Sequence, residues 1–227
     1  RGIHAIPMAE YVLGMMLSHV KQFPAMALNQ DKHTWNRKLS FGELKDKNLL
    51  ILGTGAIGCE IGRLAKAFGM NTIGLNRSGS ANSAFFDDIR TISQMDDMLP
   101  NADFIVSVLP STVETKWMLK YKHFVLMKNE AVFMNIGRGD LVEENIIHEV
   151  LENQVIGHMV LDVFPSEPLE KESKLWSYSN LTITPHISSI SQKYLPRAFE
   201  IFETNLQHFI NKNDNEYVNK IDLRKGY

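Results

Sequence analysis

Three ionisable side chains in the second half of the chain have the types and positions needed to bind a small anion and move a proton beside it. Arg138 lies between two glycines after an apolar run, where a guanidinium can hold a carboxylate through two hydrogen bonds. A surface arginine in a glycine turn is the alternative. His186 follows the apolar run 181–184, and histidine is the side chain best suited to proton exchange near neutral pH. A neighbouring carboxylate favours the imidazolium form, and Glu167 is the candidate.

The other histidines and the single cysteine indicate no metal centre. Seven histidines lack the spacing of paired metal ligands and read as surface or packing residues: His4, His19, His33, His123, His148, His158 and His208. Cys59 falls in a helical pattern, where a small buried apolar role is expected. One cysteine forms neither a disulfide framework nor a cysteine zinc site. We therefore expect no metal.

A glycine-rich turn has the pattern of a phosphate-binding loop. Its sequence is Gly53-Thr54-Gly55-Ala56-Ile57-Gly58, between an apolar run and a helical pattern. The first glycine permits the turn, the second lets the backbone approach a pyrophosphate, and the third lets the helix pack on the strand. The helix N-terminus, at Ala56 and Ile57, then faces the phosphates with free N–H groups. Alone this hexapeptide is a weak signal, because glycine turns are common in loops that bind nothing.

The residues after the second apolar run bear on the choice of dinucleotide. An acidic residue here would hold the ribose hydroxyls of NAD, but the chain has Asn76, followed by Arg77 and Ser78. A cation and a hydroxyl suit the 2′-phosphate of NADP, because arginine binds phosphate oxygens in a fork. The sequence therefore favours NADP over NAD, although asparagine can still bond a ribose hydroxyl.

A further loop has the composition to complete a coenzyme surface. Ligands of open parallel sheets lie outside the carboxyl ends of the strands. After one strongly apolar run, Leu109 and Pro110 could wall an adenine while Thr112 or Thr115 meets a phosphate. The alternative is a turn with helix-capping hydroxyls.

Short apolar runs alternating with helical patterns predict an α/β fold with a doubly wound parallel sheet, a Rossmann nucleotide-binding domain. The expected strands are residues 49–52, 71–75, 89–92, 104–109, 131–136, 156–163 and 181–184. The expected helices that accompany them are residues 57–68, 93–99, 121–127, 143–151 and 191–210.

The residues before the sheet pattern predict one helix and an extended segment. The stretch from Met8 to Phe23 reads as a helix stopped by Pro24 and is apolar on most faces. It either packs against both the sheet domain and a second subunit, which predicts a homodimer, or is a purely internal core helix. Residues 25–41 are polar apart from residues such as Trp35 and predict an extended surface segment.

Composition and charge narrow the function classes. With 44% hydrophobic and 22% charged residues, the 227-residue chain has the composition of a globular protein with a sizeable core. A formal net charge of −2 gives no reason to expect nucleic acid or an anionic membrane as a partner. The apolar runs fall far short of the ~20 residues that span a bilayer, and no secretory signal is evident. We therefore expect a cytoplasmic protein.

Five motifs occur in the order seen in the D-isomer-specific 2-hydroxyacid dehydrogenases, and the chain resembles that family over nearly its whole length. They are Gly53-x-Gly55-x-x-Gly58, Leu109-Pro110-x-Thr112-x-x-Thr115, Asn135-x-Gly137-Arg138-Gly139, Asp162-Val163-Phe164-x-x-Glu167-Pro168-Leu169 and Thr184-Pro185-His186. The resemblance implies reversible hydride transfer between a nicotinamide and the α-carbon of a small 2-oxo or 2-hydroxy acid.

The resemblance also implies roles for individual residues. Arg138 would bind the substrate carboxylate and polarise its carbonyl, His186 would be the general acid/base, and Glu167 would keep His186 protonated. Asp162 would meet the nicotinamide carboxamide. The coenzyme surface would also include Ile136, Gly137 and Ser188. These roles suit the chemistry, since reduction needs a proton at the developing alkoxide and cations stabilise that charge.

The resemblance departs at the front of the chain. Family members build a substrate-binding domain mostly from their first ~100 residues, which have no counterpart here. We expect residues 1–187 to form the NAD(P)-binding domain with a dimerisation helix. Residues 188–227 would form a helix and tail that return toward the largely absent second domain. A cleft with one wall cannot desolvate a small acid well, so we expect coenzyme binding with little or no turnover.

Two other function classes would use parts of the same pattern. A noncatalytic dinucleotide-binding or sensing module is the alternative, since related folds bind coenzymes without catalysis. The presence of Arg138, Glu167 and His186 together weighs against it, because a sensor needs none of them. A methyltransferase would use the glycine turn but leaves the later motifs unexplained.

Overall fold

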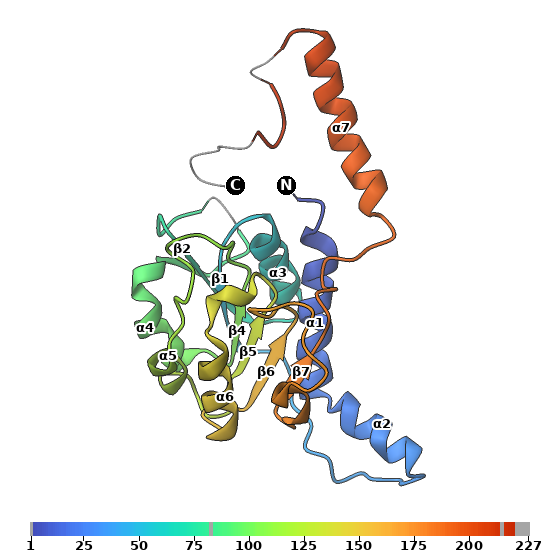
Figure 1. Cartoon of the computed structure of the whole chain (residues 1–227), viewed down its shortest axis with the longest axis vertical. Helices are drawn as coiled ribbons and strands as arrows, with labels where there is room; N and C mark the ends of the chain where they lie inside the picture. Colours follow the sequence, from blue (N-terminus) through green and yellow to red (C-terminus); the bar gives the residue numbers. More distant parts are fainter. Residues whose placement is uncertain (1, 82–83, 214–215, 221–227) are drawn as a thin grey trace.

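The computed structural model describes residues 2–81, 84–213 and 216–220 and contains a seven-stranded parallel sheet (Figure 1). Its spatial order is β3-β2-β1-β4-β5-β6-β7, and every neighbouring pair is parallel. The strands are β1 (Asn48–Leu52), β2 (Asn71–Asn76), β3 (Asp88–Thr91), β4 (Phe104–Ser107), β5 (Val132–Asn135), β6 (His158–Leu161) and β7 (Leu181–Ile183). The predicted doubly wound α/β fold is confirmed.

Helices cover both faces of the sheet (Figure 1). The α-helices are α1 (Ala5–Val20), α2 (Phe23–Asp31), α3 (Ala56–Ala67), α4 (Met95–Met98), α5 (Tyr121–Val125), α6 (Glu144–Glu152) and α7 (Tyr194–Ile210). Short 3-10 turns occur at η1 (Ile92–Gln94), η2 (Leu99–Asn101), η3 (Gly139–Leu141) and η4 (Lys174–Ser177). α1 and α3 lie on one face, and α4, α5 and α6 lie on the other.

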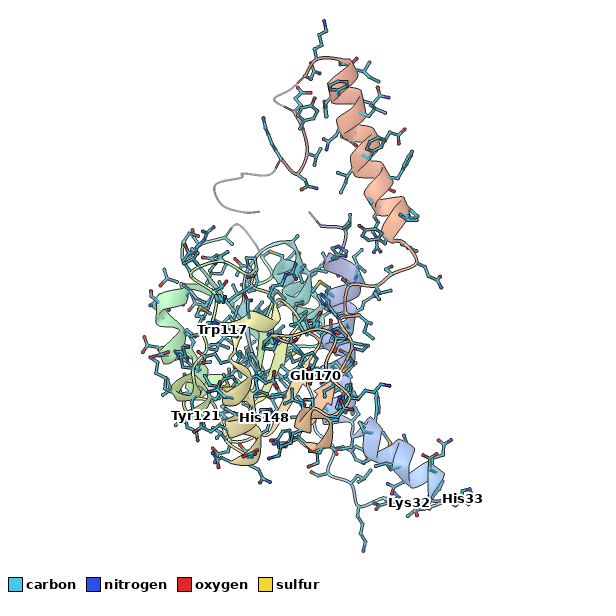
Figure 2. The ribbon with its side chains drawn as sticks, viewed as in Figure 1. Lys32, His33, Trp117, Tyr121, His148 and Glu170 are labelled. Carbon is cyan, nitrogen blue, oxygen red and sulfur yellow. The ribbon has the colours of Figure 1, made fainter. Side chains whose placement is uncertain are left out.

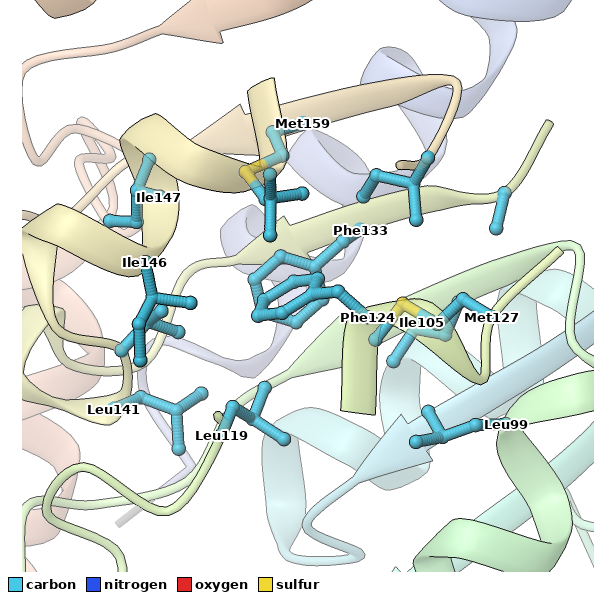
Figure 3. Close-up of a cluster of buried hydrophobic side chains, with 14 of the residues drawn as sticks. Leu99, Ile105, Leu119, Phe124, Met127, Phe133, Leu141, Ile146, Ile147 and Met159 are labelled. Atoms are coloured by element: carbon cyan, nitrogen blue, oxygen red, sulfur yellow. The ribbon is translucent and has the colours of Figure 1, made fainter. Parts of the chain in front are cut away.

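The side chains of the interior strand β1 alternate between two buried clusters. Leu49 and Ile51 pack beneath α1 and α3, whereas Leu50 and Leu52 pack beneath the helices of the opposite face. Alternation follows from the strand, whose successive side chains point to opposite faces. In the second cluster the rings of Phe124 and Phe133 meet edge to face with centroids 5.3 Å apart (Figure 3). Both faces of β1 are therefore buried, which explains its continuous apolar sequence.

Helix α1 buries one side and leaves another accessible. Six side chains on the buried side pack against α3 and the sheet: Met8, Ala9, Val12, Leu13, Met16 and Val20. Glu10 and Gly14 are exposed, and Tyr11 is half-buried. α1 is therefore not a purely internal helix in this chain. Contact with a second subunit remains a prediction.

The expected extended segment after α1 contains a second helix. α1 ends at Val20, the backbone turns through Gln22 at φ 56°, and α2 begins at Phe23. Pro24 occupies the first turn of α2, where its missing N–H costs nothing, so it starts a helix rather than stopping one. α2 has no buried residue, and Lys32 and His33 lie beyond its far end, away from the sheet (Figure 2).

Other boundaries also differ from the prediction; for example, β6 covers His158–Leu161 rather than 156–163. β4 ends at Ser107 rather than Leu109, because the chain leaves the ladder before its apolar run finishes. The expected helix over 93–99 is divided between η1, α4 and η2. The proline at position 100 lies in η2, where it forms part of a tight turn.

Helix α7 extends away from the sheet and its covering helices (Figure 1). None of its described residues is buried, and several large apolar side chains are exposed, namely Leu195, Phe199, Phe202, Phe209 and Ile210. Its first turn lies beside the start of α1, where the rings of His4 and Tyr194 stack with centroids 5.5 Å apart. The predicted division at residue 187 remains a prediction, and residues 221–227 lie outside the described residues.

Candidate active site

The predicted site residues lie in loops at one edge of the sheet. β1 leads into the glycine turn, β2 into Asn76 and its neighbours, β5 into Arg138, β6 into Asp162 and β7 into His186. Because all seven strands are parallel, these loops emerge at their common carboxyl edge. The strand order reverses between β1 and β4, which is where open α/β sheets bind ligands.

The glycine turn requires glycine at two of its positions. Gly53 has φ 107°, a conformation that L side chains rarely adopt. A Cβ on Gly58 would lie 1.9 Å from the carbonyl oxygen of Gly53, so any side chain there would separate the turn from α3. Gly55 is exposed, with no protein atom within 4 Å of the place where its Cβ would be. The protein leaves space directly outside Gly55.

The residues around this space fit the pyrophosphate of a dinucleotide. Gly55 is the N-cap of α3 and provides no side chain that could satisfy the helix N–H groups. The first N–H groups of a helix have no intrahelical acceptor, and the helix dipole favours an anion there. Ala56, Ile57 and Gly58 form the first turn of α3 and therefore direct these groups toward the open space.

The Asn76 side chain is occupied by its own loop. Its Nδ2 donates to Thr54 Oγ1 at 2.7 Å and to the Ser80 carbonyl at 2.9 Å. Its Oδ1 accepts from the Gly79 N–H at 2.7 Å and from Ser78 Oγ at 3.1 Å. Asn76 thus ties the end of β2 to the glycine turn. The predicted contact with a ribose hydroxyl remains a prediction.

Arg77 lies between two loops of the coenzyme edge. The pKa of Glu114 is lowered mainly by a hydrogen bond from Thr112 and by its own backbone N–H, and to a smaller degree by the cation of Arg77. Arg77 and Glu114 both occupy exposed positions. The positive charge of Arg77, after β2, therefore acts on the Glu114 carboxylate in the loop after β4.

The loop after β4 has the hydrogen bonds of an ordered turn. Thr115 Oγ1 donates to the Pro110 carbonyl at 2.6 Å and accepts from the Thr112 N–H at 2.8 Å. Leu109 is half-buried and Pro110 is exposed. These bonds close a turn, but they cap no helix, since the next one, α5, begins at Tyr121. The contact of Thr115 with a coenzyme remains a prediction.

Arg138 is held on a turn that touches two neighbouring loops. A Cβ on Gly139 would lie 2.0 Å from the Phe164 carbonyl, so the absence of a side chain lets this turn pack against the loop after β6. Asn135 holds the turn through Nδ2 to the Arg138 carbonyl at 2.9 Å and through Oδ1 from the Gly137 N–H at 3.2 Å. Gly137 and its neighbour Ile136 are buried, whereas Arg138 is exposed, and its Nη1 donates to the Gly137 carbonyl at 2.7 Å.

Asp162 is fully buried and organises the loop after β7. Its Oδ1 accepts from Thr184 Oγ1 at 2.5 Å and from the Ile187 N–H at 2.9 Å. Its Oδ2 accepts from the N–H of Ser188, itself buried, at 2.9 Å. These three donors fix residues 184–188 against the end of β6. The predicted contact between Asp162 and a nicotinamide remains a prediction.

Glu167 and His186 are brought together from different loops. His186 Nδ1 lies 2.7 Å from Glu167 Oε2, and Glu167 Oε1 accepts from the Phe164 N–H at 2.9 Å. The carboxylate is therefore anchored to backbone on one side and to the imidazole on the other. A charged carboxylate only accepts hydrogen bonds, so Nδ1 is the donor and Nε2 is the nitrogen available to a substrate. The side chain of His186 is 46% exposed and that of Glu167 is 34% exposed.

Two residues that the sequence reasoning did not assign to the site also contact it. Thr184 bonds Asp162, and Tyr11 of α1 places its hydroxyl 2.6 Å from Thr184 Oγ1. Thr184 was within a recognised motif, so its polar side chain at a strand end was a usable signal. Tyr11 is 173 positions away from Thr184, and no local pattern connects them.

The described part of the chain has neither a cluster of metal ligands nor a helix that could span a membrane. No group of three or more His, Cys, Asp or Glu side chains there is arranged to hold a metal ion. Among the same residues, no helix is both long and apolar enough to cross a bilayer.

The strand order, the uncapped glycine turn and the paired loops at the carboxyl edge define a dinucleotide-binding domain. Residues 13–188 match the family described as "D-isomer specific 2-hydroxyacid dehydrogenase, NAD binding domain". The chain belongs to this family, and the resemblance stated from its motifs is confirmed.

Relatives with solved structures share the whole fold. A D-isomer specific 2-hydroxyacid dehydrogenase family protein from Aeromonas salmonicida is 39% identical, with a TM-score of 0.89 over 98% of this chain and 70% of that chain. An NADPH-dependent glyoxylate/hydroxypyruvate reductase from Sinorhizobium meliloti, in complex with NADP and sulfate, is 31% identical. Its TM-score is 0.83 over 98% of this chain and 70% of that chain.

Curated relatives are longer than this chain. D-3-phosphoglycerate dehydrogenase of Methanocaldococcus jannaschii is 33% identical over 183 residues, which are 80% of this chain and 35% of the relative. The chain thus spans about a third of the length of the first curated relatives it matches.

Proposed function

We propose that this chain is the coenzyme-binding part of an NAD(P)-dependent D-2-hydroxyacid dehydrogenase. The reaction is hydride transfer between a nicotinamide and the α-carbon of a small 2-oxo or 2-hydroxy acid. The observation that carries this proposal is the Glu167–His186 pair, 2.7 Å apart at the same sheet edge as the glycine turn. A dinucleotide turn alone supports only binding, whereas the pair adds a group that can exchange a proton.

Arg138, His186 and Glu167 each have a separate role in the proposed reaction. A bound nicotinamide coenzyme supplies or accepts the hydride. Arg138, exposed on the turn that packs against the loop after β6, binds the substrate carboxylate and stabilises negative charge on the carbonyl oxygen. His186 gives a proton from Nε2 to the developing alkoxide in reduction and takes it back in oxidation. Glu167 accepts a hydrogen bond from Nδ1 and so holds the imidazole in the orientation that leaves Nε2 for the substrate.

NADP is the proposed coenzyme, with NAD as the second choice. The loop after β2 carries no acidic side chain between Asn76 and Ser80, and it carries Arg77 and Ser78, which suit a 2′-phosphate. The reductase from Sinorhizobium meliloti is described as NADPH-dependent, which supports the same preference.

A homodimer in the cytoplasm completes the proposal. α2 and the segment after it place large apolar side chains in the open: Phe23, Leu28, Trp35 and Phe41 are all at least half exposed. A second subunit would shield these side chains from water, and they therefore support the proposed interface. The cytoplasm is the compartment that we propose, since a chain with a single cysteine has no intramolecular disulfide to keep.

The turnover test compares this chain with the complete product of its reading frame. NADPH oxidation is measured with glyoxylate, hydroxypyruvate and pyruvate. The chain alone leaves Arg138 and His186 exposed to water, so we expect little or no turnover from it despite coenzyme binding. Turnover by the chain alone at the rate of the complete product would contradict this expectation.

Two substitutions separate the dehydrogenase from the noncatalytic dinucleotide-sensing module. In the complete product, Arg138→Ala and His186→Ala should each lower kcat/KM by about 100-fold or more, since each removes a group that stabilises the transition state. Coenzyme affinity should change little. Activity unaffected by both substitutions rejects the catalytic roles, and coenzyme binding without activity toward any tested acid favours the sensor.

A further inference from the structure

A hydrogen-bonded chain runs from helix α1 to the loop that carries His186. The Tyr11 hydroxyl lies 2.6 Å from Thr184 Oγ1, and Thr184 Oγ1 lies 2.5 Å from Asp162 Oδ1. Tyr11 comes from the first helix and Thr184 from the end of the last strand, so this contact spans nearly the whole sheet domain in sequence.

The available protons determine which atom donates in each of these two hydrogen bonds. The Asp162 carboxylate can only accept, so Thr184 uses its one hydroxyl proton to donate to Asp162. Thr184 Oγ1 then has only lone pairs left, and Tyr11 must be the donor to it. The bond from Thr184 to Asp162, at 2.5 Å, has the short length typical of a hydroxyl that donates to a charged oxygen.

Asp162, the last group of this hydrogen-bonded chain, holds the backbone next to the His186 imidazole. Asp162 accepts from the N–H groups of Ile187 and Ser188. The N–H of His186 donates to the Asp162 carbonyl at 2.9 Å and to the Thr184 carbonyl at 3.0 Å. His186 itself has φ 55°, a left-handed conformation that is unfavourable for a non-glycine residue. These contacts impose that conformation and so aim the ring at Glu167.

The surroundings of Tyr11 keep its hydroxyl protonated. Burial, with a smaller contribution from the charge of Asp162, raises the pKa of Tyr11 to about 12. The hydroxyl therefore remains a donor at every pH at which a histidine can change its charge. The Tyr11 ring also packs against the buried cluster beneath α1 and α3, so it is anchored independently of its hydroxyl.

We propose that Tyr11 is a positioning residue for His186, acting through Thr184 and Asp162. This inference rests on the proposed dehydrogenase function. Tyr11 touches neither substrate nor coenzyme in this role. It holds Thr184 Oγ1 in the orientation that donates to Asp162, and Asp162 then holds residues 187 and 188.

The first test is Tyr11→Phe in the complete gene product, with Tyr178→Phe as the matched control. Tyr178 also uses its hydroxyl, which bonds Glu152 and His148 away from the catalytic loop. Tyr11→Phe should lower kcat by about tenfold, since small displacements of a catalytic group cost one to two orders of magnitude. KM for NADPH should stay within about twofold, and Tyr178→Phe should leave kcat unchanged. An unchanged kcat in Tyr11→Phe overturns the proposal.

Substitutions at Thr184 test the pathway. Thr184→Ser keeps the hydroxyl and should retain most of kcat, whereas Thr184→Val removes it and should lower kcat at least as much as Tyr11→Phe. Adding Tyr11→Phe to Thr184→Val should cause no further loss of kcat, because the hydrogen-bonded chain is already interrupted at Thr184. Additive losses would show that Tyr11 acts by another route and would overturn the proposal.

Hydrogen exchange separates failure of this inference from failure of the proposed function. In this chain, Tyr11→Phe should accelerate exchange of the Ile187 and Ser188 amides, and Tyr178→Phe should not. If wild-type protein reduces no 2-oxo acid, the dehydrogenase proposal fails while the exchange data still decide whether Tyr11 orders the loop. Unchanged exchange in Tyr11→Phe overturns the positioning role even if the enzyme is active.

Discussion

At the scale of single residues, the loop after β2 shows how internal hydrogen bonds limit the side chains that can meet a ligand. Asn76 directs both ends of its amide to Thr54, Ser78, Gly79 and Ser80. Releasing it to a ribose would leave several of these groups without a partner, at a cost of about 1 kcal/mol for each bond. Arg77 is therefore the residue on which coenzyme choice should depend most.

Substitution of Arg77 tests coenzyme preference directly. Arg77→Ala should weaken NADPH binding by about tenfold or more, since a hydrogen bond to a charged group contributes about 1.5–3 kcal/mol. NADH binding should be unchanged because NADH lacks the 2′-phosphate. Coenzyme fluorescence titration of this chain gives both dissociation constants.

The matched control for Arg77 is Arg63→Ala. Arg63 lies on α3 and is paired with Glu60 at 2.7 Å, so its removal changes net charge equally without touching the loop after β2. Equal weakening in both variants would indicate a general charge effect. Equal loss of NADPH and NADH affinity in Arg77→Ala would contradict recognition of a 2′-phosphate.

At the scale of secondary-structure elements, a histidine pair joins α1 to β6. The rings of His19 and His158 have centroids 5.4 Å apart, and His158 Nε2 lies 2.8 Å from Thr182 Oγ1 on β7. Burial, and to a smaller degree the charge of His19, lowers the pKa of His158 to about 4. Burial also lowers the pKa of His19. Protonation of either ring therefore opposes the packing of α1.

This pair predicts acid sensitivity of the folded state. A histidine whose pKa is lowered by folding takes up protons more readily when unfolded, so stability falls as pH drops from about 6.5 to about 4. For His158 alone the loss is about 2 kcal/mol by pH 5 and about 3 kcal/mol by pH 4. Urea unfolding at pH 7 and pH 5 measures it.

The variant His158→Gln assigns that acid sensitivity. Glutamine can still bond Thr182 but does not titrate, so its stability should change less between pH 7 and pH 5 than that of the wild type. His33→Asn is the control, since His33 is exposed beyond α2 and asparagine tolerates its positive φ. The same pH dependence in His158→Gln and wild type would show that another group is responsible.

At the scale of the whole molecule, α2 is notable because packing within one chain does not account for its apolar side chains. It has no buried residue, its Leu28 is 57% exposed, and Trp35 beyond it is 93% exposed. Light scattering at micromolar concentration should therefore give the mass of a dimer. A monomer as the sole species would contradict the proposed homodimer.

Charge on α2 tests whether that helix forms the interface. Leu28→Glu should shift the protein to monomer, because a carboxylate buried at an interface has no partner and loses its hydration. Gln30→Glu adds the same charge at an exposed position of the same helix and should remain dimeric. Dissociation by both substitutions would indicate a general effect of charge.

Sequence patterns predicted the sheet well because its physical signals are local. The run from Leu49 to Leu52 is buried on both faces, and Gly53 and Gly58 have steric requirements that only glycine meets. The same patterns failed for α2. In a sequence, a proline in the first turn of a helix looks the same as a proline that stops a helix, and only the backbone turn at Gln22 distinguishes them.

The candidate site was predictable in part. Arg138 and His186 follow their strands within three residues and Glu167 lies in the loop after β6, so the sheet brings their loops to one edge. The hydrogen bonds of Asn76 and Asp162 were not predictable, because their partners are set by loop conformation. The Tyr11–Thr184 contact depends on how α1 crosses the sheet, which residue spacing does not encode.

The stacking of His4 on Tyr194 has a mechanical consequence. The segment that enters the sheet domain and the segment that leaves it pass side by side, with Arg197 Nη1 3.5 Å from the Ile3 carbonyl. These two contacts tie the direction in which α7 leaves the sheet domain to the position of the start of α1, so a shift of one of these segments must be accompanied by a shift of the other.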